Sequence, residues 1–219
     1  MKYSTTAPMA LYPIKFFYNV SQIFFNSYFC IEAFMLAYRN SYGFTCNSYN
    51  QMNPKVANLM WLFYLSKMWD FWDTIFIVMG KKWKQLSFLH IYHHCSVILI
   101  CWLQLNVYYD GNAYLFIMLN AFIHTVMYTY YFICMHTKDP ITGKSLPIWW
   151  KSFLTRFQMI QFMILMSSGV WAYLRGCDGC NHRVSIFCIV YTATLLILFA
   201  LFFIQAYGNP KQKSKLKNK

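Results

Sequence analysis

The sequence predicts an all-α protein that crosses a membrane several times, and three observations lead to this fold class. Of its 219 residues, 58% are hydrophobic and 21% are aromatic, whereas only 11% are charged. Apolar stretches long enough to cross a bilayer recur along the chain. The basic residues gather in the short connections and in a tail. A soluble domain of this size rarely has such a composition, so we expect a polytopic membrane protein.

Six candidate spans follow one another along the chain, each roughly 18–27 residues long and therefore able to cross hydrocarbon as a helix. They are Tyr12–Tyr38, Val56–Met79, Ser87–Gln104, Ala113–Met135, Ile148–Leu174 and Val184–Tyr207. Helix is required, because a segment in lipid must satisfy its own backbone hydrogen bonds. No internal repeat or linker divides the chain, so residues 1–219 are expected to form a single transmembrane domain with a basic tail at 208–219.

The first five spans carry polar residues, and in four of them these residues repeat at helical spacing. The first contains Gln22 and Glu32. The polar stripes of the next four spans are, in order, Lys67, Asp70, Asp73 and Thr74; His90, His93 and His94; Asn120, His124, Met127, Tyr128 and Tyr131; and Thr155, Gln158 and Phe162 with Gln161 adjacent. Within each stripe the members mostly repeat at three- or four-residue steps and share a helix face. We expect the four stripes to face one common interior.

Five charged residues lie within the spans, namely Glu32, Lys67, Asp70, Asp73 and Arg156. Each costs about 2.5–3.5 kcal/mol at the centre of a bilayer if it is left unpaired. We therefore expect these residues to face the interior of the bundle and to pair, or to line a wet cavity. Lys67 and Asp70 can pair within their helix. A purely structural role near helix ends is the alternative for the set.

Lysine and arginine predict the orientation of the spans. The richer side holds Lys2, Lys15, Lys81, Lys82, Lys84, Lys138, Lys144, Lys151 and the lysines of the tail, whereas the other side holds Arg39, Lys55, Arg175 and Arg183. Both termini are thus expected in the cytosol, which also explains the net charge of +13 without a nucleic-acid partner. The ending "KLKNK" resembles a dilysine retrieval signal of endoplasmic reticulum proteins, although any basic tail near anionic lipid would look similar.

Three cysteines, Cys46, Cys177 and Cys180, fall on the opposite, luminal side, where disulfides are permitted. Cys46 paired with Cys177 or Cys180 would tie two loops together. A Cys-x-x-Cys zinc or redox site is the alternative, but it lacks a second pair of ligands.

The histidines of "HIYHH" allow two kinds of chemistry. Imidazoles bind iron and zinc, and di-iron desaturases carry a similar box. The chain has only six histidines, too few for a di-iron centre, so no metal is expected; a single ion bound by His90, His93, His94 or His124 is the alternative. Acyl chemistry is the other kind, because a neutral imidazole shielded from water is both a nucleophile and a general base. An interhelical hydrogen bond would suffice for one histidine but not for four.

Four motifs on successive spans, "KMWDFWDT", "HIYHH", "NAFIHTVMYTYY" and "TRFQMIQF", resemble the fatty acid elongase family over about residues 12–207. "FFYN", Gln22 and Glu32 are similar to the family as well. The resemblance implies a very-long-chain 3-oxoacyl-CoA synthase that condenses an acyl-CoA with malonyl-CoA and releases carbon dioxide and CoA. It also implies a ring of six helices around an acyl tunnel, in the endoplasmic reticulum membrane.

The resemblance also implies roles for individual residues. His93 would accept the acyl group and His124 would act on the malonyl half, while His90 and His94 would orient and tune them. Asn120, Tyr128, Tyr131, Gln158 and Gln161 would hydrogen-bond CoA or the oxyanion, and Lys67, Asp70 and Arg156 would suit CoA phosphates and pantetheine; Asp73 is included in this substrate-binding set. No cofactor is expected. The partners expected are membrane lipid, other enzymes of the elongation cycle and a second copy of the chain.

The chain departs from the family pattern in two ways. Asp70 stands where the family usually has Glu, and no span corresponds to the family's usual first helix. Gln85 with "QLSFLHIYHH" and "FIHTVMYTYYF" is more like the elongases of polyunsaturated acids, with a saturated substrate as the competing interpretation. A membrane carrier of lipid or solute would need the same polar interior, but the paired repeats and broken helices common in transporters are not evident.

Overall fold

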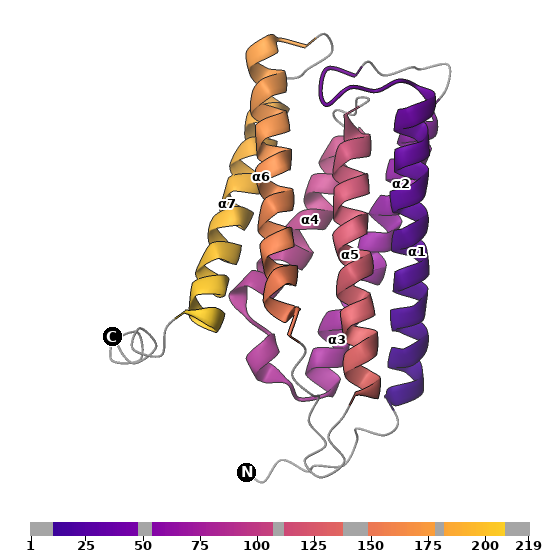
Figure 1. Ribbon diagram of the computed structural model, residues 1–219, viewed down its shortest axis with the longest axis vertical. Coiled ribbons are helices and arrows are strands. Elements are labelled where there is room, and N and C mark those ends of the chain that lie inside the picture. The colour runs from indigo at the N-terminus through magenta and orange to yellow at the C-terminus, as the bar shows by residue number, and fades with distance from the viewer. Residues whose placement is uncertain (1–10, 48–53, 107–111, 138–148, 178–181, 209–219) are drawn as a thin grey trace.

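A computed structural model describes residues 11–47, 54–106, 112–137, 149–177 and 182–208, and these ranges contain helices and no strand. The helices are α1 (Tyr12–Arg39), α2 (Lys55–Trp69), α3 (Phe71–Met79), α4 (Phe88–Asn106), α5 (Ala113–His136), α6 (Lys151–Arg175) and α7 (His182–Tyr207), with a 3₁₀ turn η1 at Trp83–Gln85. They stand side by side along the long axis of the molecule, as Figure 1 shows.

Five of these helices are long and apolar enough to cross a membrane, namely α1, α4, α5, α6 and α7. Their bounds differ from the predicted spans by no more than three residues. The prediction for residue 148 and for the tail beyond 208 lies outside the described residues. The chain is therefore an all-helical, multi-pass membrane protein, as the sequence predicts.

The predicted second span, Val56–Met79, is two helices rather than one. Asp70 keeps right-handed helical dihedrals (φ −63°, ψ −16°), but the N–H of Asp73 bonds the Asp70 carbonyl three residues back, at 3.1 Å. A step of this kind tightens the backbone and interrupts the regular ladder. At the break, the side chain of Asp70 accepts hydrogen bonds from Lys67 of α2 and Gln22 of α1, which fix its position. The prediction of one continuous helix was wrong at this residue.

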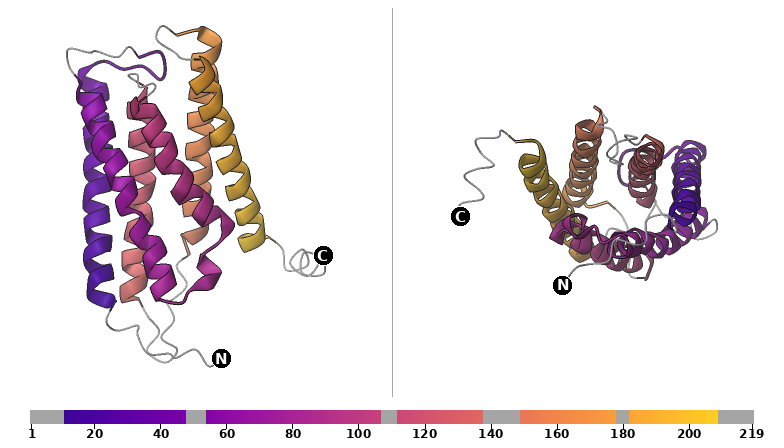
Figure 2. Two further views of the ribbon diagram at one scale, coloured as in Figure 1. Left: turned by 180° about the vertical axis from the view of Figure 1, so that it is seen from behind. Right: turned by 90° about the horizontal axis from the view of Figure 1, so that it is seen from below.

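The helices close a ring in the order α1, α2, α4, α7, α6, α5 and back to α1, because each neighbouring pair in this order is in contact. Figure 2 shows this arrangement from below, with α4 and α2 along one side and α6, α5 and α1 along the other. An apolar core that includes Phe29, Met60, Phe63, Cys101 and Ile117 fills the space between α1, α2, α4 and α5. Their packing fixes the four helices that carry most of the polar residues.

A disulfide between Cys46 and Cys177 joins the segment after α1 to the end of α6, with their Cα atoms 5.2 Å apart. Cys180, the alternative partner, lies outside the described residues. The same segment after α1 also holds α5, because Asn47 donates to the Asn112 side chain at 2.9 Å and the Tyr114 hydroxyl donates to the Gly43 carbonyl at 2.9 Å. The end of the ring at which α6 ends is therefore held by covalent and polar bonds.

Candidate active site

A chain of buried polar side chains joins α1, α2, α3 and α5 inside the ring. The Lys67 ammonium donates to Asp70 Oδ2 and to Asn120 Oδ1, each at 3.1 Å, and lies 4.4 Å from the centre of the Phe63 ring. Lys67, Asp70 and Asn120 are all buried. Within the described residues, Lys67 and Asp70 form the one ion pair. This pair neutralises two of the charges that the sequence places in the membrane.

From Asp70 the hydrogen bonds continue through α1 to the second aspartate. Gln22 Nε2 donates to Asp70 Oδ1 at 2.7 Å and to the Tyr18 hydroxyl at 3.0 Å. The Tyr128 hydroxyl donates its proton to Asp73 Oδ2 at 2.6 Å. Since that proton is used, the Tyr18 hydroxyl, 3.2 Å away, must be the donor to Tyr128. Asp73 is thus held by a hydroxyl, with no cation beside it among the described residues.

Tyr18 and Gln22 are central to this network but were not among the predicted site residues. A signal for them exists in the sequence, because Asn19, Gln22 and Asn26 repeat at i, i+3 and i+7 in the first span and share one face. All three are buried. This amide stripe belongs with the four stripes that were identified.

The histidine box lies on α4, where it meets α3 and α5. His90 Nε2 is 2.8 Å from the Thr74 hydroxyl, which fixes that ring against α3. The ring centres of His90 and His94 are 4.3 Å apart, and those of His94 and His93 are 5.4 Å apart. The three rings therefore form one cluster, as their shared helix face predicts. His94 also contacts Phe71, next to the break at Asp70, with ring centres 6.5 Å apart.

His93 faces His124 of α5, with ring centres 6.4 Å apart. Unlike His90, the His93 imidazole has no hydrogen bond to another side chain or to the backbone of the described residues, and it lies beside Phe199 of α7. His124 is 6% exposed, and its Nδ1 is buried without a hydrogen-bond partner. Buried polar atoms are rarely left unpaired, and those that are need an explanation. The ring nitrogens of His93 and His124 are thus available to a ligand that enters between the two rings.

Other predicted site residues lie at the edges of this cluster. Tyr131 touches Tyr128, with ring centres 5.9 Å apart, and remains 39% exposed. Gln161 is buried on α6, whereas Gln158 is half-buried, with its Nε2 4.0 Å from the sulfur of Met127.

Glu32 and Arg156 differ from the expectation that the charged residues of the spans face the interior and pair or line a wet cavity, because neither belongs to the polar network of Lys67, Asp70 and Asp73. Glu32 and Arg156 make no ion pair within the described residues, and Arg156 lies exposed on α6. The physical reason is position on the helix: Arg156 follows Thr155 and so projects about 100° away from it, off the face that bears Thr155 and Phe162. Glu32 is half-buried at the edge of the α1 face that packs in the ring.

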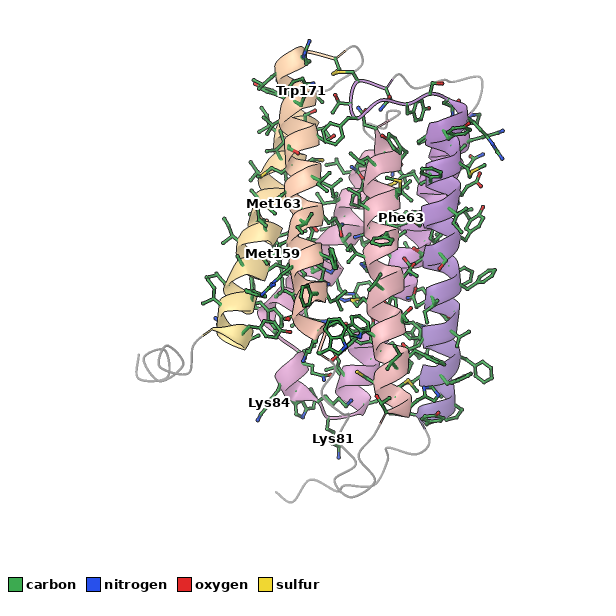
Figure 3. The ribbon with its side chains drawn as sticks, in the orientation of Figure 1. Phe63, Lys81, Lys84, Met159, Met163 and Trp171 are labelled. Carbon is green, nitrogen blue, oxygen red and sulfur yellow. A yellow bond between two sulfur atoms is a disulfide. The ribbon has the colours of Figure 1, made fainter. Side chains whose placement is uncertain are left out.

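The described residues contain no group of three or more His, Cys, Asp or Glu side chains arranged to hold a metal ion. The imidazoles of the histidine box contact one another, the Thr74 hydroxyl and neighbouring aromatic rings. Figure 3 shows Phe63 in the middle of the bundle, Lys81 and Lys84 at one end, and Trp171 at the other. The apolar core and the polar network therefore meet near Phe63, against which Lys67 packs.

Residues 1–215 match the model of the ELO family, described as the GNS1/SUR4 family. The chain is 35% identical to very long chain fatty acid elongase 2 of Mus musculus over 222 residues, covering 100% of this chain and 74% of the mouse protein. It is 31% identical to very long chain fatty acid elongase 4 of Homo sapiens over 209 residues, covering 94% of this chain and 65% of that protein. It is 32% identical to very long chain fatty acid elongase 5 of Tachysurus fulvidraco over 203 residues, covering 91% and 67%. The chain therefore belongs to the fatty acid elongase family and is a membrane enzyme of very-long-chain fatty acid elongation.

Proposed function

We propose that this chain condenses a long-chain acyl-CoA with malonyl-CoA to a 3-oxoacyl-CoA two carbons longer. The observation that carries the proposal is the pair of imidazoles on α4 and α5, His93 and His124, which face each other and make no side-chain hydrogen bond to any residue that the structure describes. An unpaired ring nitrogen keeps its lone pair for a substrate. The relatives are named for the elongation of very long chains, which this reaction begins.

In the first step, a ring nitrogen of His93 attacks the thioester carbonyl of the acyl-CoA. A C–N bond forms, the C–S bond breaks, and CoA leaves with the proton that the imidazole gives up. The product is an acyl-imidazole, which is a reactive acyl donor. The aromatic surroundings of His93, including Phe199, favour retention of the acyl group over hydrolysis, because they leave little room for water.

In the second step, the malonyl carboxylate leaves as carbon dioxide, and the electrons of that C–C bond form an enolate. The enolate carbon attacks the acyl carbonyl, a new C–C bond forms, and His93 is released and takes up one proton from solution. The unpaired Nδ1 of His124 is suited to hydrogen-bond the malonyl half, and the amide N–H of Asn120, one turn away on the same helix face, is suited to donate to the developing negative charge.

His93→Ala should abolish incorporation of labelled malonyl-CoA into longer acyl chains by microsomes that contain the chain, because it removes the proposed nucleophile. His136→Ala is the matched control, since His136 lies at the end of α5 and bonds Tyr12 and the Phe132 carbonyl. It should leave incorporation near the wild-type level. Full activity of His93→Ala would disprove the nucleophile.

His124→Ala separates the two steps. With labelled acyl-CoA and no malonyl-CoA, this variant should still acquire a hydroxylamine-sensitive label, while the complete reaction yields no 3-oxoacyl-CoA. A carrier would instead lose lipid binding or flux and would show no covalent label. Loss of labelling together with loss of product in His124→Ala would mean that the roles are not divided in this way.

We further propose that the enzyme acts in the endoplasmic reticulum membrane with its C-terminus in the cytosol, beside the other enzymes of the elongation cycle, with self-association as a further expectation. The lysine distribution and the "KLKNK" ending support this location. Polyunsaturated acyl chains are the proposed substrates. The fatty-acid profile of yeast that expresses the chain and is fed saturated and polyunsaturated acids tests this preference.

A further inference from the structure

Arg156 is a charged residue of the spans that, like Glu32, the condensation site does not explain. Its guanidinium lies 5.2 Å from the centre of the Phe153 ring and 5.5 Å from that of Phe203 on α7. It has no ion pair or hydrogen bond within the described residues. The acidic residues there, Glu32, Asp70 and Asp73, belong to α1 and to the α2–α3 region rather than to α6 or α7. An arginine at membrane depth therefore lacks an anion supplied by these residues.

The space beside Arg156 is a groove of about 440 Å³ between α6 and α7. Its lining is Ser152, Arg156, Phe203, Ile204, Tyr207 and Gly208. Higher up, the two helices are in close contact, since a Cβ on Gly169 would lie 3.1 Å from Cγ1 of Ile189. They diverge towards the end that carries Lys81 and Lys84, as Figures 1 and 3 show. The groove lies in that divergence, at the basic end of the molecule.

The position of the groove near the ends of α6 and α7 places it, by our inference, close to the boundary between headgroups and hydrocarbon. Arg156 comes five residues after the start of α6 at Lys151, about 7.5 Å along the helix axis. Ile204 and Tyr207 lie in the last turn of α7 and are exposed. One end of the groove thus offers a guanidinium and the hydroxyls of Ser152 and Tyr207, while its wall offers aromatic and aliphatic surface.

We propose that this groove binds an anionic glycerophospholipid, with its phosphodiester on Arg156 and an acyl chain along Phe203 and Ile204. The planar guanidinium matches two phosphate oxygens, and such charge-assisted pairs are strong. Basic pockets between transmembrane helices at the positively charged side are suited to anionic lipid headgroups. CoA also carries phosphate, but the groove is on the side of α6 away from the face of Gln161 and Phe162, both of which are buried. The lipid site stands independently of the condensation reaction.

The test measures retention of phosphatidylinositol and of phosphatidylcholine by the purified full chain, using native mass spectrometry. Wild type should retain phosphatidylinositol in preference. Arg156→Ala should weaken that retention about tenfold or more, as expected for loss of a hydrogen-bonded charge, and Arg156→Lys should lie between them. Arg175→Ala is the matched control, because Arg175 lies over Trp171 at the other end of α6, 5.0 Å from its ring centre, and should bind lipid like wild type.

A second variant, Ile204→Trp, fills the apolar wall and leaves Arg156 in place. It should lower retention as well, and it keeps the proposal testable if Arg156→Ala is poorly folded by size-exclusion chromatography. Equal retention by wild type and both variants would overturn the proposal. Displacement of the lipid from wild type by CoA, together with loss of CoA binding in Arg156→Ala, would also overturn it and would assign Arg156 to the substrate.

Discussion

Lys67 is the residue on which the polar network depends most. It is 2% exposed and bonds Asp70 on its own helix segment and Asn120 on α5. Its hydrocarbon stem passes the Phe63 ring, so the same side chain serves both the apolar core and the polar chain. Asp70 accepts hydrogen bonds from both Lys67 and Gln22. The position of the Lys67 ammonium is therefore coupled through Gln22 and the two tyrosines as far as Asp73.

Lys67→Met should destabilise the protein by about 3–5 kcal/mol, because it leaves the Asp70 carboxylate buried without its cation. Asp70→Asn added to Lys67→Met should recover part of this loss, since an amide can still accept from Gln22. The measurement is the thermal unfolding midpoint in detergent. Lys84→Met, at an exposed residue, is the control and should change little. Identical midpoints for the two lysine variants would show that the pair is not holding the structure.

At this scale the sequence predicted that polar residues of several helices gather inside the bundle, and it missed specific partners. The pairing of Lys67 with Asp70 follows from their i, i+3 spacing, and the structure has it. The bond from Gln22 to Asp70 spans 48 positions, and no local spacing encodes it. Arg156 was placed with the interior set because it is charged, although its angle on the helix relative to Thr155 already separates it from the buried face.

The helices themselves were predictable because lipid demands long apolar stretches with internally satisfied backbones. The break between α2 and α3 was not. Asp70 keeps helical dihedrals, so the spacing of Lys67, Asp70 and Asp73 looks the same with or without the tightened turn. The angle between α6 and α7 was also beyond the sequence pattern, since it depends on which small residue meets which neighbour.

Gly169→Ala tests that contact between elements. The added Cβ would lie 3.1 Å from Cγ1 of Ile189, which is closer than ordinary packing, so the Ile189 side chain must shift or the contact between α6 and α7 must loosen. We expect a loss of about 1–3 kcal/mol in the free energy of unfolding, measured by thermal denaturation. Ile189→Ala in the same chain should relieve the overlap. Gly43→Ala, where the nearest atom is 3.8 Å away, is the control. An unchanged midpoint in Gly169→Ala would mean that the contact between α6 and α7 can accommodate a methyl group.

The whole molecule is a ring closed by contacts between neighbouring helices and tied at one end by the Cys46–Cys177 disulfide. The sequence predicted a bridge from Cys46 to the loop after the fifth span and left two partners open, Cys177 and Cys180. The choice depends on where the turn after α6 places each sulfur. Gly176 adopts a left-handed conformation (φ 58°) there, which ends α6 and carries Cys177 back toward the segment after α1.

Cys46→Ser should lower the thermal unfolding midpoint, because the bridge closes a loop of 131 residues that the unfolded chain would otherwise explore. We expect the free energy of unfolding to fall by about 2–4 kcal/mol. Cys30→Ser, at a free half-buried cysteine of α1, is the control. Peptide mapping without reductant should recover the Cys46–Cys177 pair. A Cys46–Cys180 peptide in its place, or equal midpoints for both variants, would contradict this assignment.

The bridge has a further consequence for what a single cut in the backbone can do. A protease that nicks any connection between α2 and α6 produces two fragments that share one sulfur–sulfur bond, so they migrate as one species until a reductant is added. A nick beyond Cys177 releases α7 as a separate fragment under either condition. Limited proteolysis followed by electrophoresis with and without reductant therefore sorts the connections of the ring by their position relative to this link.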